Sequence, residues 1–360
     1  QRGHRLVGQR AANFVKMLVT EGADAALAGR ASLDQGMDRR QVSITYSIED
    51  AVSRLKTEGG LSSSDIVLIK GGPSSRMELI TSALLANEED NKLLPRSTFI
   101  EQGAAFMRHT RPSWVDIDLN ALATNVRQIK TLIGQHVTLF AVVKADAYGH
   151  GAVAVARTAL LNGAEHLAVA SISEAIELRD AGLEAPILVM SHTPIQAIRQ
   201  AVRQNITVTL YDLELARFYD RAAREAGGIL RVHVKVDTGM GRLGVVASAA
   251  VPFFRHLLNL NHLELEGIFT HFSLADETPD YTAEQVRIFK RVLTPLRAAG
   301  FSFKYIHAAN SAGTLASKDN HFNAVRVGLA MYGLSPSDEV RVPPTFRPVM
   351  AWKTAVAQVK

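Results

Sequence analysis

Short apolar runs alternate with stretches of helical periodicity along most of the chain, and the first such series covers residues 4–88. Apolar or β-branched residues predict short strands, the last of them buried, at 17–20, 42–46 and 66–69. Helical periodicity lies between them, at about 5–16, 23–36, 50–56 and 77–85. This alternation predicts a small Rossmann-like domain over residues 1–95, with a parallel sheet covered by helices. The polar, irregular segment 96–112 is interpreted as a linker.

From Ser113 the alternation becomes longer and more regular, after a strand-like WVDID segment and a helix at about 119–133. Apolar runs predict strands at 138–143, 166–171, 186–191, 206–211, 230–237, 264–271, 305–310 and 324–332. Periodic segments predict helices at 151–163, 173–181, 194–204, 212–226, 248–259 and 281–299, with a short one after Ser311. Eight strand–helix units predict a closed (β/α)8 barrel over residues 113–343, and an open doubly wound sheet is the alternative. Residues 344–360 predict the first strand of a C-terminal β domain.

Composition narrows the classes of protein to consider. The 360 residues are 47% hydrophobic and 21% charged, as in ordinary soluble domains, and the net charge is +5. The charges are mixed in sign, which argues against a nucleic-acid-binding arm, and no apolar run is long enough to span a membrane. The sequence contains no cysteine, which excludes disulfides and fits a cytoplasmic protein. Because the chain begins at Gln1 and stops within a strand-like stretch, we interpret it as a piece of a longer protein.

Polar residues follow the predicted barrel strands, where barrels carry their chemistry. Lys144 ends the first strand, Lys235 lies on the fifth, His271 ends the sixth and Arg326 lies on the eighth. The other polar residues at strand ends are Ser171, Ser191, Tyr211, Asp237, Asn310 and Ser311. Two amines, an imidazole and a guanidinium around one opening predict a cationic mouth for a small phosphate or carboxylate.

Lys144 has two interpretations. A lone lysine at a strand end commonly extends into solvent. Among other cations on a rigid barrel, burial and like charge instead lower the pKa of an ammonium, which makes a Schiff-base former or a general base. Tyr148, four residues later, either reaches a ligand phosphate or only packs.

The segment KVDTGMGRLG contains a literal G-x-G-x-x-G at 239–244. A dinucleotide site requires an acidic residue at the end of the next strand, whereas Glu264 and Glu266 fall inside that strand. We therefore expect a tight loop that places Arg242 in the mouth, where Lys235 would repel it unless an anion intervenes. Ser311 either holds a phosphate, with Asn310 and with Gly328-Leu329 on the last strand, or only caps a helix.

Six segments together resemble a known family: RPSWVDIDLNAL, AVVKADAYGHG, KVDTGMGRLG, GIFTHFSLADE, HAANSAG and AVRVGLAMYGLSP. In this order and spacing they are similar to the barrel domain of pyridoxal-phosphate-dependent alanine racemases, over about 111–343 and into the second domain at 346–360. The resemblance implies that Lys144 links to pyridoxal 5′-phosphate and acts as one of two bases. It also implies a small amino-acid substrate, no metal and a homodimer of the full-length protein.

The resemblance also assigns roles to the other matching positions. The phosphate would be held by Tyr148, Asn310, Ser311, Gly328 and Leu329. Arg326 would face the pyridine nitrogen beside His271, and Arg242 would contact the phenolic oxygen and the substrate. Lys235 matches a position that is carbamylated in many members, and such an anion would remove its repulsion with Arg242. The second base would be a tyrosine of the partner subunit, from a domain beyond Lys360, so we expect little racemase activity from the chain as given.

The first 95 residues resemble a different family. HRLVGQRAA, MLVTEGADAALAG and DIVLIKGGPSSRME are similar to the C-terminal domain of Mur ligases, closest to the one that adds D-alanyl-D-alanine to a UDP-muramoyl tripeptide. Gly72 and Pro73 replace the serine and arginine usual in that family. The resemblance implies a ligase–racemase fusion of peptidoglycan synthesis. The alternatives are a serine racemase, a basic-amino-acid decarboxylase, a ligase substrate-binding module with an inactive barrel, and a nicotinamide dehydrogenase.

Overall fold

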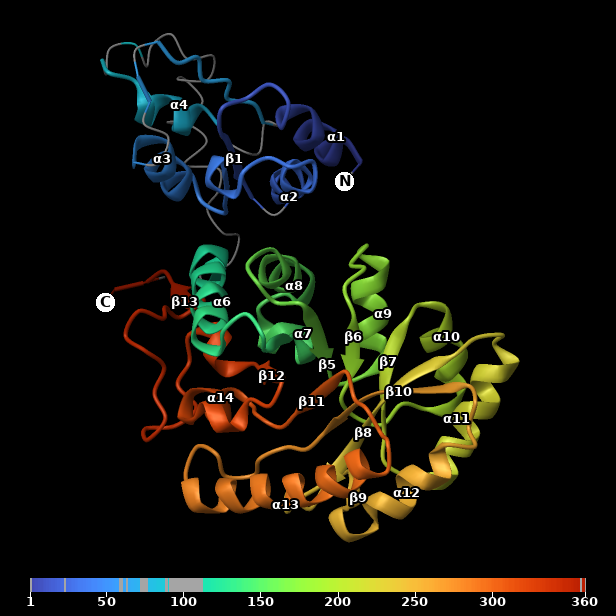
Figure 1. Cartoon of the computed structure of the whole chain (residues 1–360). Coiled ribbons are helices and arrows are strands. Elements are labelled where there is room, and N and C mark those ends of the chain that lie inside the picture. Colours follow the sequence, from blue (N-terminus) through green and yellow to red (C-terminus); the bar gives the residue numbers. More distant parts are fainter. Residues whose placement is uncertain are drawn as a thin grey trace. The chain divides into compact units, whose positions relative to one another are not determined.

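The computed structural model describes residues 2–22, 24–57, 61–62, 64–71, 77–87, 90, 113–356 and 358–359 (Figure 1). The chain divides into two compact units, one formed by Gln1–Asn120 with Met350–Lys360 and the other by Ala121–Val349. The linker predicted at 96–112 lies outside the described residues. No helix in the described part is both long and apolar enough to cross a bilayer.

The N-terminal part of the first unit alternates helices and strands as predicted. Its elements are α1 (Arg2–Ala11), β1 (Leu18–Glu21), α2 (Ala26–Asp34), the 3-10 helix η1 (Arg39–Gln41), β2 (Val42–Thr45), α3 (Ile48–Thr57) and α4 (Glu78–Leu84). β1 and β2 pair in parallel, with Leu18 opposite Val42 and Glu21 opposite Thr45. α1 approaches α2 so closely that a Cβ on Gly8 would lie 2.0 Å from the Ala28 carbonyl oxygen. The parallel arrangement follows from the helical connection between the two strands.

The strand predicted at 66–69 is wrong. These residues are irregular, and the side chains of Ile66 and Leu68 are 97% and 86% exposed. An apolar run of four residues carries too little periodicity to establish a strand, because strands also need a neighbouring edge to pair with. In the described part of this sheet, β1 and β2 pair with each other.

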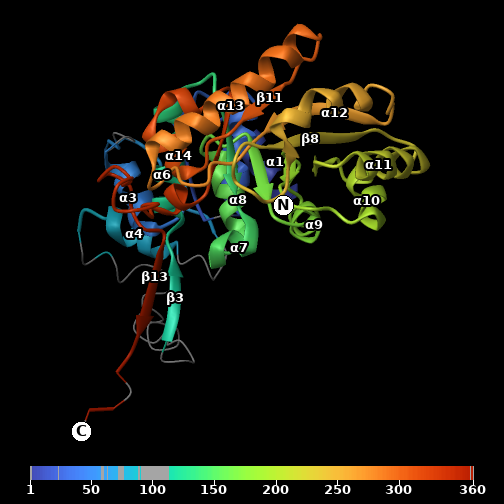
Figure 2. The ribbon, with the colours of Figure 1, turned by 90° about the horizontal axis from the view of Figure 1, so that it is seen from below.

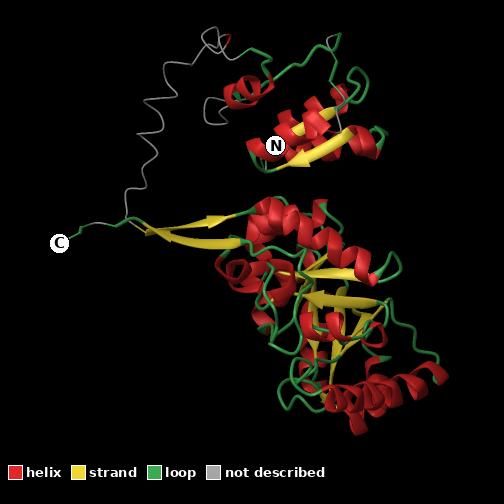
Figure 3. Ribbon diagram, turned by 90° about the vertical axis from the view of Figure 1, so that its left-hand side faces the viewer, coloured by secondary structure: helices red, strands yellow, loops and turns green. Residues whose placement is uncertain are grey.

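The first unit also contains two strands that are distant in sequence. β3 (Ser113–Ile117) pairs antiparallel with β13 (Met350–Thr354), and the pair lies side by side in two views (Figure 2 and Figure 3). The hydroxyls of Ser113 and Thr354 are 2.9 Å apart at one end of the pair. Both strands were predicted from the sequence.

The second unit is a closed parallel barrel, as predicted. Its strands are β4 (Thr138–Val142), β5 (His166–Val169), β6 (Ile187–Val189), β7 (Ile206–Leu210), β8 (Leu230–Asp237), β10 (Leu263–Phe269), β11 (Tyr305–His307) and β12 (Ala324–Val327). They follow the order β10-β11-β12-β4-β5-β6-β7-β8, and pairing of β8 with β10 closes the ring. The short β9 (Val245–Val246) adds to β8.

Helices surround the barrel (Figure 1). They are α6 (Leu119–Ile133), α7 (Lys144–Gly149), α8 (Ala152–Leu161), α9 (Ile172–Asp180), α10 (Ile198–Arg203), α11 (Leu213–Glu225), α12 (Ala250–Leu257), α13 (Pro279–Ala298) and α14 (Ser311–Ala316). The 3-10 helices are η4 (Ile195–Ala197), η5 (Ala247–Ala249), η6 (Lys318–Asn320) and η7 (Leu329–Tyr332). In α6 the buried stripe Leu122, Val126, Ile129 and Ile133 has the helical spacing that packs one face on a core.

Side chains fill the barrel interior. Phe140, Val142, Leu188 and Tyr305 belong to one buried cluster. Fully burying such a side chain stabilises the fold by about 1.5–3 kcal/mol. Close-packed strands of this kind give the residues at their carboxyl ends a rigid base.

Candidate active site

Lys144 follows β4 directly, as the sequence predicted, but the backbone after it is unusual. Residues 145–148, none of them glycine, have φ between 50° and 55° and ψ between 36° and 52°, so α7 is a left-handed turn. The left-handed conformation costs about 1–2 kcal/mol for each L-residue. Gly149 and Gly151, which follow, also have positive φ, at 82° and 88°. Nothing in the sequence pattern predicted that the four residues before them would share this conformation.

Two carboxylates hold the left-handed turn in place. Asp146 accepts a hydrogen bond from the backbone N–H of Ala152 at 2.6 Å. Glu174, on α9, accepts one from the N–H of Ala145 at 2.7 Å. Strained backbone persists only where its surroundings fix it in this way. The position of Lys144 at the barrel rim is therefore set by neighbouring elements as well as by its own strand.

Tyr148, Ser311 and Gly328 come together from three separate segments. The tyrosine hydroxyl lies so close to Gly328 that a Cβ there would be 2.8 Å from its oxygen. The Ser311 hydroxyl accepts hydrogen bonds from the backbone N–H groups of Gly328 at 3.0 Å and Ala330 at 3.3 Å. Burial raises the pKa of Tyr148, which keeps its hydroxyl a donor. These groups form a small cradle of hydroxyls and backbone atoms, and a side chain at position 328 would fill it.

The segment around this cradle differs from the prediction in two details. β12 ends at Val327, so Gly328 and Leu329 do not lie on a strand, and Leu329 begins η7 with its side chain 36% exposed. Ser311 does not cap α14, because the cap is Asn310, whose side-chain oxygen accepts from the N–H of Gly313 at 2.9 Å. An apolar run cannot show where a strand becomes a 3-10 turn.

Arg326, on β12, is buried, and both terminal nitrogens of its guanidinium contact acceptors. One terminal nitrogen donates to the carbonyl oxygens of Thr270 at 2.8 Å and Ala308 at 3.0 Å and lies 3.2 Å from His271 Nδ1. The other terminal nitrogen is 2.6 Å from His307 Nδ1. Burial lowers the pKa of Arg326 to about 9, which still leaves the group positively charged at neutral pH. The acceptors fix both its charge and its orientation.

The structure brings the cations predicted for the mouth close enough to act on one another. Burial, followed by the charges of Arg326 and Arg242, lowers the pKa of Lys235 to about 8. Burial and the neighbouring cations, Arg326 first, lower the pKa of His271 to about 3, so its imidazole is neutral. Lys144 also acts on both groups. A concentration of positive charge with buried members favours a bound anion.

Arg242 lies exposed on the glycine loop after β8. The Asp237 carboxylate accepts hydrogen bonds from the backbone N–H groups of Gly239, Met240 and Gly241 at 2.9–3.2 Å. Gly239 has φ 129° and Gly241 has φ 69°, values that favour glycine. A dinucleotide site needs a glycine loop that opens directly into a helix. This loop leads to the strand β9 instead. The glycines therefore serve the turn.

The contacts of three polar residues behind Arg326 were not predicted from the sequence. His307, on β11, contacts its guanidinium, and His233 and Glu266 lie further inside the barrel. Each lies on a predicted strand between apolar residues, where the pattern gives no sign of its partner. The available signal was the presence of ionisable residues on strands buried on both faces, which is rare without a polar partner.

Comparison with known proteins gives one consistent result. Residues 117–336 match the family model "Alanine racemase, N-terminal domain". Alanine racemase 1 of Oceanobacillus iheyensis is 42% identical over 252 residues, which cover 69% of this chain and 67% of that protein. Alanine racemase of Desulfosudis oleivorans is 44% identical over 259 residues, covering 69% and 66%. The chain thus matches about two thirds of the length of these relatives.

Solved structures agree. Alanine racemase of Clostridium difficile 630 has a TM-score of 0.68 and 38% identity, covering 70% of this chain and 71% of that chain. Alanine racemase from Bacillus anthracis with bound L-Ala-P has a TM-score of 0.65 and 40% identity, covering 68% and 64%.

Proposed function

We propose that this chain, which belongs to the alanine racemase family, carries the cofactor-binding barrel of an enzyme that interconverts L-alanine and D-alanine. The observation that carries the proposal is the position of Lys144. The lysine stands on a rigid left-handed turn at the barrel rim, with its Nζ 5.8 Å from the centre of the Tyr148 ring. Tyr148 also belongs to the hydroxyl cradle with Ser311. The charge of Lys144 acts on Lys235 and His271, and His271 contacts the buried Arg326.

The residues of the mouth fit pyridoxal 5′-phosphate. The cradle at Gly328 offers hydroxyls and a close approach of the backbone, and both suit a phosphate. The residues that would hold this phosphate are Tyr148, Asn310, Ser311, Gly328 and Leu329. Lys144 would hold the cofactor covalently, Arg326 and His271 would lie at its ring, and Arg242 would meet its phenolic oxygen. When bound, the cofactor accepts the electron pair left at the substrate Cα after proton removal.

The chain's own residues would then control protons and charge. The Lys144 amine takes a proton from the substrate Cα, or returns one, on the face of the substrate that it approaches. Arg242 attracts the substrate carboxylate by its charge. Arg326 keeps its own proton, because its N–H groups already donate to fixed acceptors. An arginine that retains its proton protonates no ring nitrogen beside it, which limits electron withdrawal and by-products.

Exchange of the alanine Cα proton with solvent tests the proposal, because exchange needs only one base. We expect the chain, supplied with pyridoxal 5′-phosphate in D2O, to replace the Cα proton of alanine with deuterium, as seen by proton NMR. Faster exchange with alanine than with serine would support alanine as the substrate. A cofactor-loaded chain that exchanges neither enantiomer would contradict the proposal.

Lys235 is proposed to be carbamylated. Below about pH 8 its buried ammonium faces Arg326 and Arg242, an arrangement that burial and like charge both disfavour. A neutral amine attacks carbon dioxide, a C–N bond forms, an electron pair moves onto oxygen, and a proton is released to solvent. The product is a carbamate anion, which these two arginines would stabilise.

We expect [13C]bicarbonate to give a carbamate carbon signal in the NMR spectrum of the chain. Lys235→Ala should lose this signal, because it removes the buried amine whose pKa is lowered. Lys318→Ala, which changes an exposed lysine of η6, should keep it. A signal that survives Lys235→Ala, or no signal at saturating bicarbonate, would show that Lys235 is unmodified.

The remaining proposals concern the whole protein. We infer that residues 1–95 form a domain like the C-terminal domain of a Mur ligase, which the quoted motifs and the parallel β1–β2 pair support. An experimental structure of the chain with an antiparallel sheet there would contradict this.

We also propose a cytoplasmic ligase–racemase fusion that forms a homodimer when full length. A monomeric mass in sedimentation of the full-length protein would contradict the dimer.

A further inference from the structure

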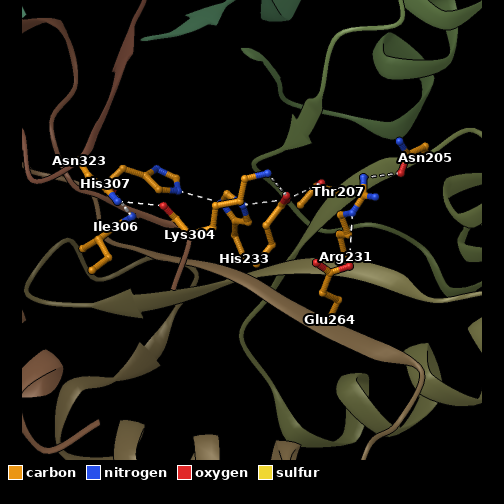
Figure 4. A network of polar contacts seen from close by, with 10 residues as sticks. Asn205, Thr207, Arg231, His233, Glu264, Lys304, Ile306, His307 and Asn323 are labelled. Atoms are coloured by element: carbon orange, nitrogen blue, oxygen red, sulfur yellow. Dashed lines mark hydrogen bonds and ion pairs between the residues drawn. The ribbon is translucent and has the colours of Figure 1, made fainter. Parts of the chain in front are cut away.

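A line of polar side chains runs from Arg326 into the barrel interior. Figure 4 shows His307, His233, Thr207 and Lys304, which belong to this line or contact its inner end. His307 Nδ1 is 2.6 Å from an Arg326 nitrogen, and His307 Nε2 is 2.8 Å from His233 Nδ1. His233 Nε2 lies 3.5 Å from a carboxylate oxygen of Glu266. The same Glu266 oxygen, Oε2, accepts a hydrogen bond from the Thr207 hydroxyl at 3.2 Å, and the other oxygen, Oε1, lies 3.5 Å from Lys304 Nζ. We call Arg326, His307, His233 and Glu266 the interior chain.

The hydrogen bonds of the interior chain can run in only one direction. A guanidinium can only donate, so His307 Nδ1 must accept and its proton must lie on Nε2. That proton points to His233 Nδ1, which must also accept, so the second proton lies on His233 Nε2. This last N–H faces Glu266, and an ionised carboxylate can only accept. Each imidazole therefore has a single tautomer that agrees with both of its neighbours.

The charges agree with this direction. Burial lowers the pKa of His307 and of His233, so both imidazoles are neutral. Burial acts to raise the pKa of Glu266, but the contact with His233 and the charge of Lys304 outweigh it and lower the pKa. The interior chain thus has a cation at one end, an anion at the other and two neutral imidazoles between them.

The backbone is shaped to admit these side chains. The pairing of β8 with β10 is irregular between Leu265 and Gly267, so Glu266 lies in a β-bulge. Bulges re-aim a side chain. A Cβ on Gly267 would lie 2.8 Å from three atoms of the His233 ring, so only glycine leaves room for the imidazole.

The His307 ring is fixed by its neighbours. It stacks on Phe269, with centroids 4.8 Å apart and planes at 1°, and on Phe140, at 5.1 Å and 16°. A clamped ring cannot turn to change which nitrogen faces Arg326. With its orientation fixed, the His307 ring can still change which nitrogen carries the proton. Only the tautomer with an unprotonated Nδ1 can accept a hydrogen bond from the guanidinium.

We propose that Glu266 and His233 are positioning residues that fix His307 in the Nε2–H tautomer and so hold Arg326 as a charged donor in its observed orientation. The interior chain reaches the mouth through Arg326. The proposal rests on the proposed function in one respect, namely that Arg326 faces the cofactor. The assignment of tautomers stands without it.

The native chain gives the first test, because nitrogen shifts of 15N-labelled histidines distinguish the two tautomers and the imidazolium. Signals are assigned by replacing His233 and His307 in turn by Gln. We expect both residues to carry the proton on Nε2, with an unprotonated Nδ1, across neutral pH. A proton on Nδ1 of either residue, or a charged imidazolium, would overturn the proposal whether or not a cofactor binds.

Variants of Glu266 give the second test. In Glu266→Gln the amide oxygen can still accept from His233, so we expect the native tautomers. In Glu266→Leu the Nε2 proton of His233 loses the carboxylate that lies 3.5 Å away, and loss of this buried contact with a charge shifts the tautomer ratio about tenfold toward Nδ1–H. Glu264→Gln, with a 54% exposed side chain that meets Arg231, is the matched control and should change nothing. Native tautomers in a folded Glu266→Leu would contradict the role of Glu266. If that variant does not fold, the 15N spectrum of the native chain still tests the assignment of the tautomers.

The third test asks whether Glu266 influences the cofactor through Arg326. The measurement is the pH dependence of the absorbance of the lysine-linked cofactor. Glu266→Leu should move its midpoint by about one pH unit, equivalent to a tenfold change in protonation, with Gln moving it less and Glu264→Gln not at all. An unchanged midpoint in Glu266→Leu would overturn the link to Arg326. A native chain that binds no cofactor would instead contradict the proposed function, and the tautomer measurement would still decide the inference.

Discussion

Lys144→Ala is expected to remove the covalent attachment of the cofactor and to slow exchange of the alanine Cα proton by about 10²–10⁴-fold, the usual contribution of a positioned base. The amine of Lys144 supplies both the tether and the base on its face, and the rigid left-handed turn offers no second amine at that position. The comparison is made by proton NMR in D2O with equal concentrations of the folded proteins.

Lys318→Ala is the matched control for Lys144→Ala. It removes an exposed lysine of η6 outside the mouth and should exchange at the native rate. Exchange by Lys144→Ala at more than about one tenth of the native rate would show that another group acts as the base.

Arg326→Glu is expected to raise transamination relative to proton exchange and to destabilise the barrel by about 3–5 kcal/mol. The native guanidinium donates to the carbonyl oxygens of Thr270 and Ala308, and a carboxylate there would meet them as a second acceptor. A carboxyl group at this position can share a proton with a ring nitrogen, which the native arginine does not. Pyruvate formed from alanine, divided by deuterium exchange, measures the by-product, and urea unfolding measures stability.

Arg326→Lys separates charge from geometry. It retains a cation but cannot reproduce the guanidinium fork, so it should lose stability without increasing pyruvate. An unchanged ratio of pyruvate to exchange in Arg326→Glu would contradict the role of Arg326 in limiting by-products.

Much of the barrel could be predicted because its strands are buried on both faces and read as continuous apolar runs. The eight strands, their order of appearance and the polar residues at their carboxyl ends all followed from that pattern. The length of the last strand did not, because Gly328 through Tyr332 remain apolar after the chain has turned into η7. The strand predicted at 66–69 was wrong for a related reason, because an apolar run does not form a strand without a neighbouring strand edge to pair with.

The site was predictable as a set of charges, but its geometry was not. Lys144, Lys235, His271 and Arg326 could be placed in one mouth because parallel strands bring their carboxyl ends together. The left-handed turn at 145–148 depends in part on an acceptor from a distant segment, Glu174, and local propensity argues against it. The interior chain depends on a bulge at Glu266 and on the absence of a Cβ at Gly267, which only a three-dimensional register reveals.

The most direct measurement is the location of the cofactor. The purified chain is loaded with pyridoxal 5′-phosphate, reduced with borohydride, digested and mapped by mass spectrometry. We expect the visible absorbance of the loaded protein to disappear on reduction and the label to lie on Lys144, in the peptide containing AVVKADAYGHG. A label on another lysine, or no fixed label, would contradict it.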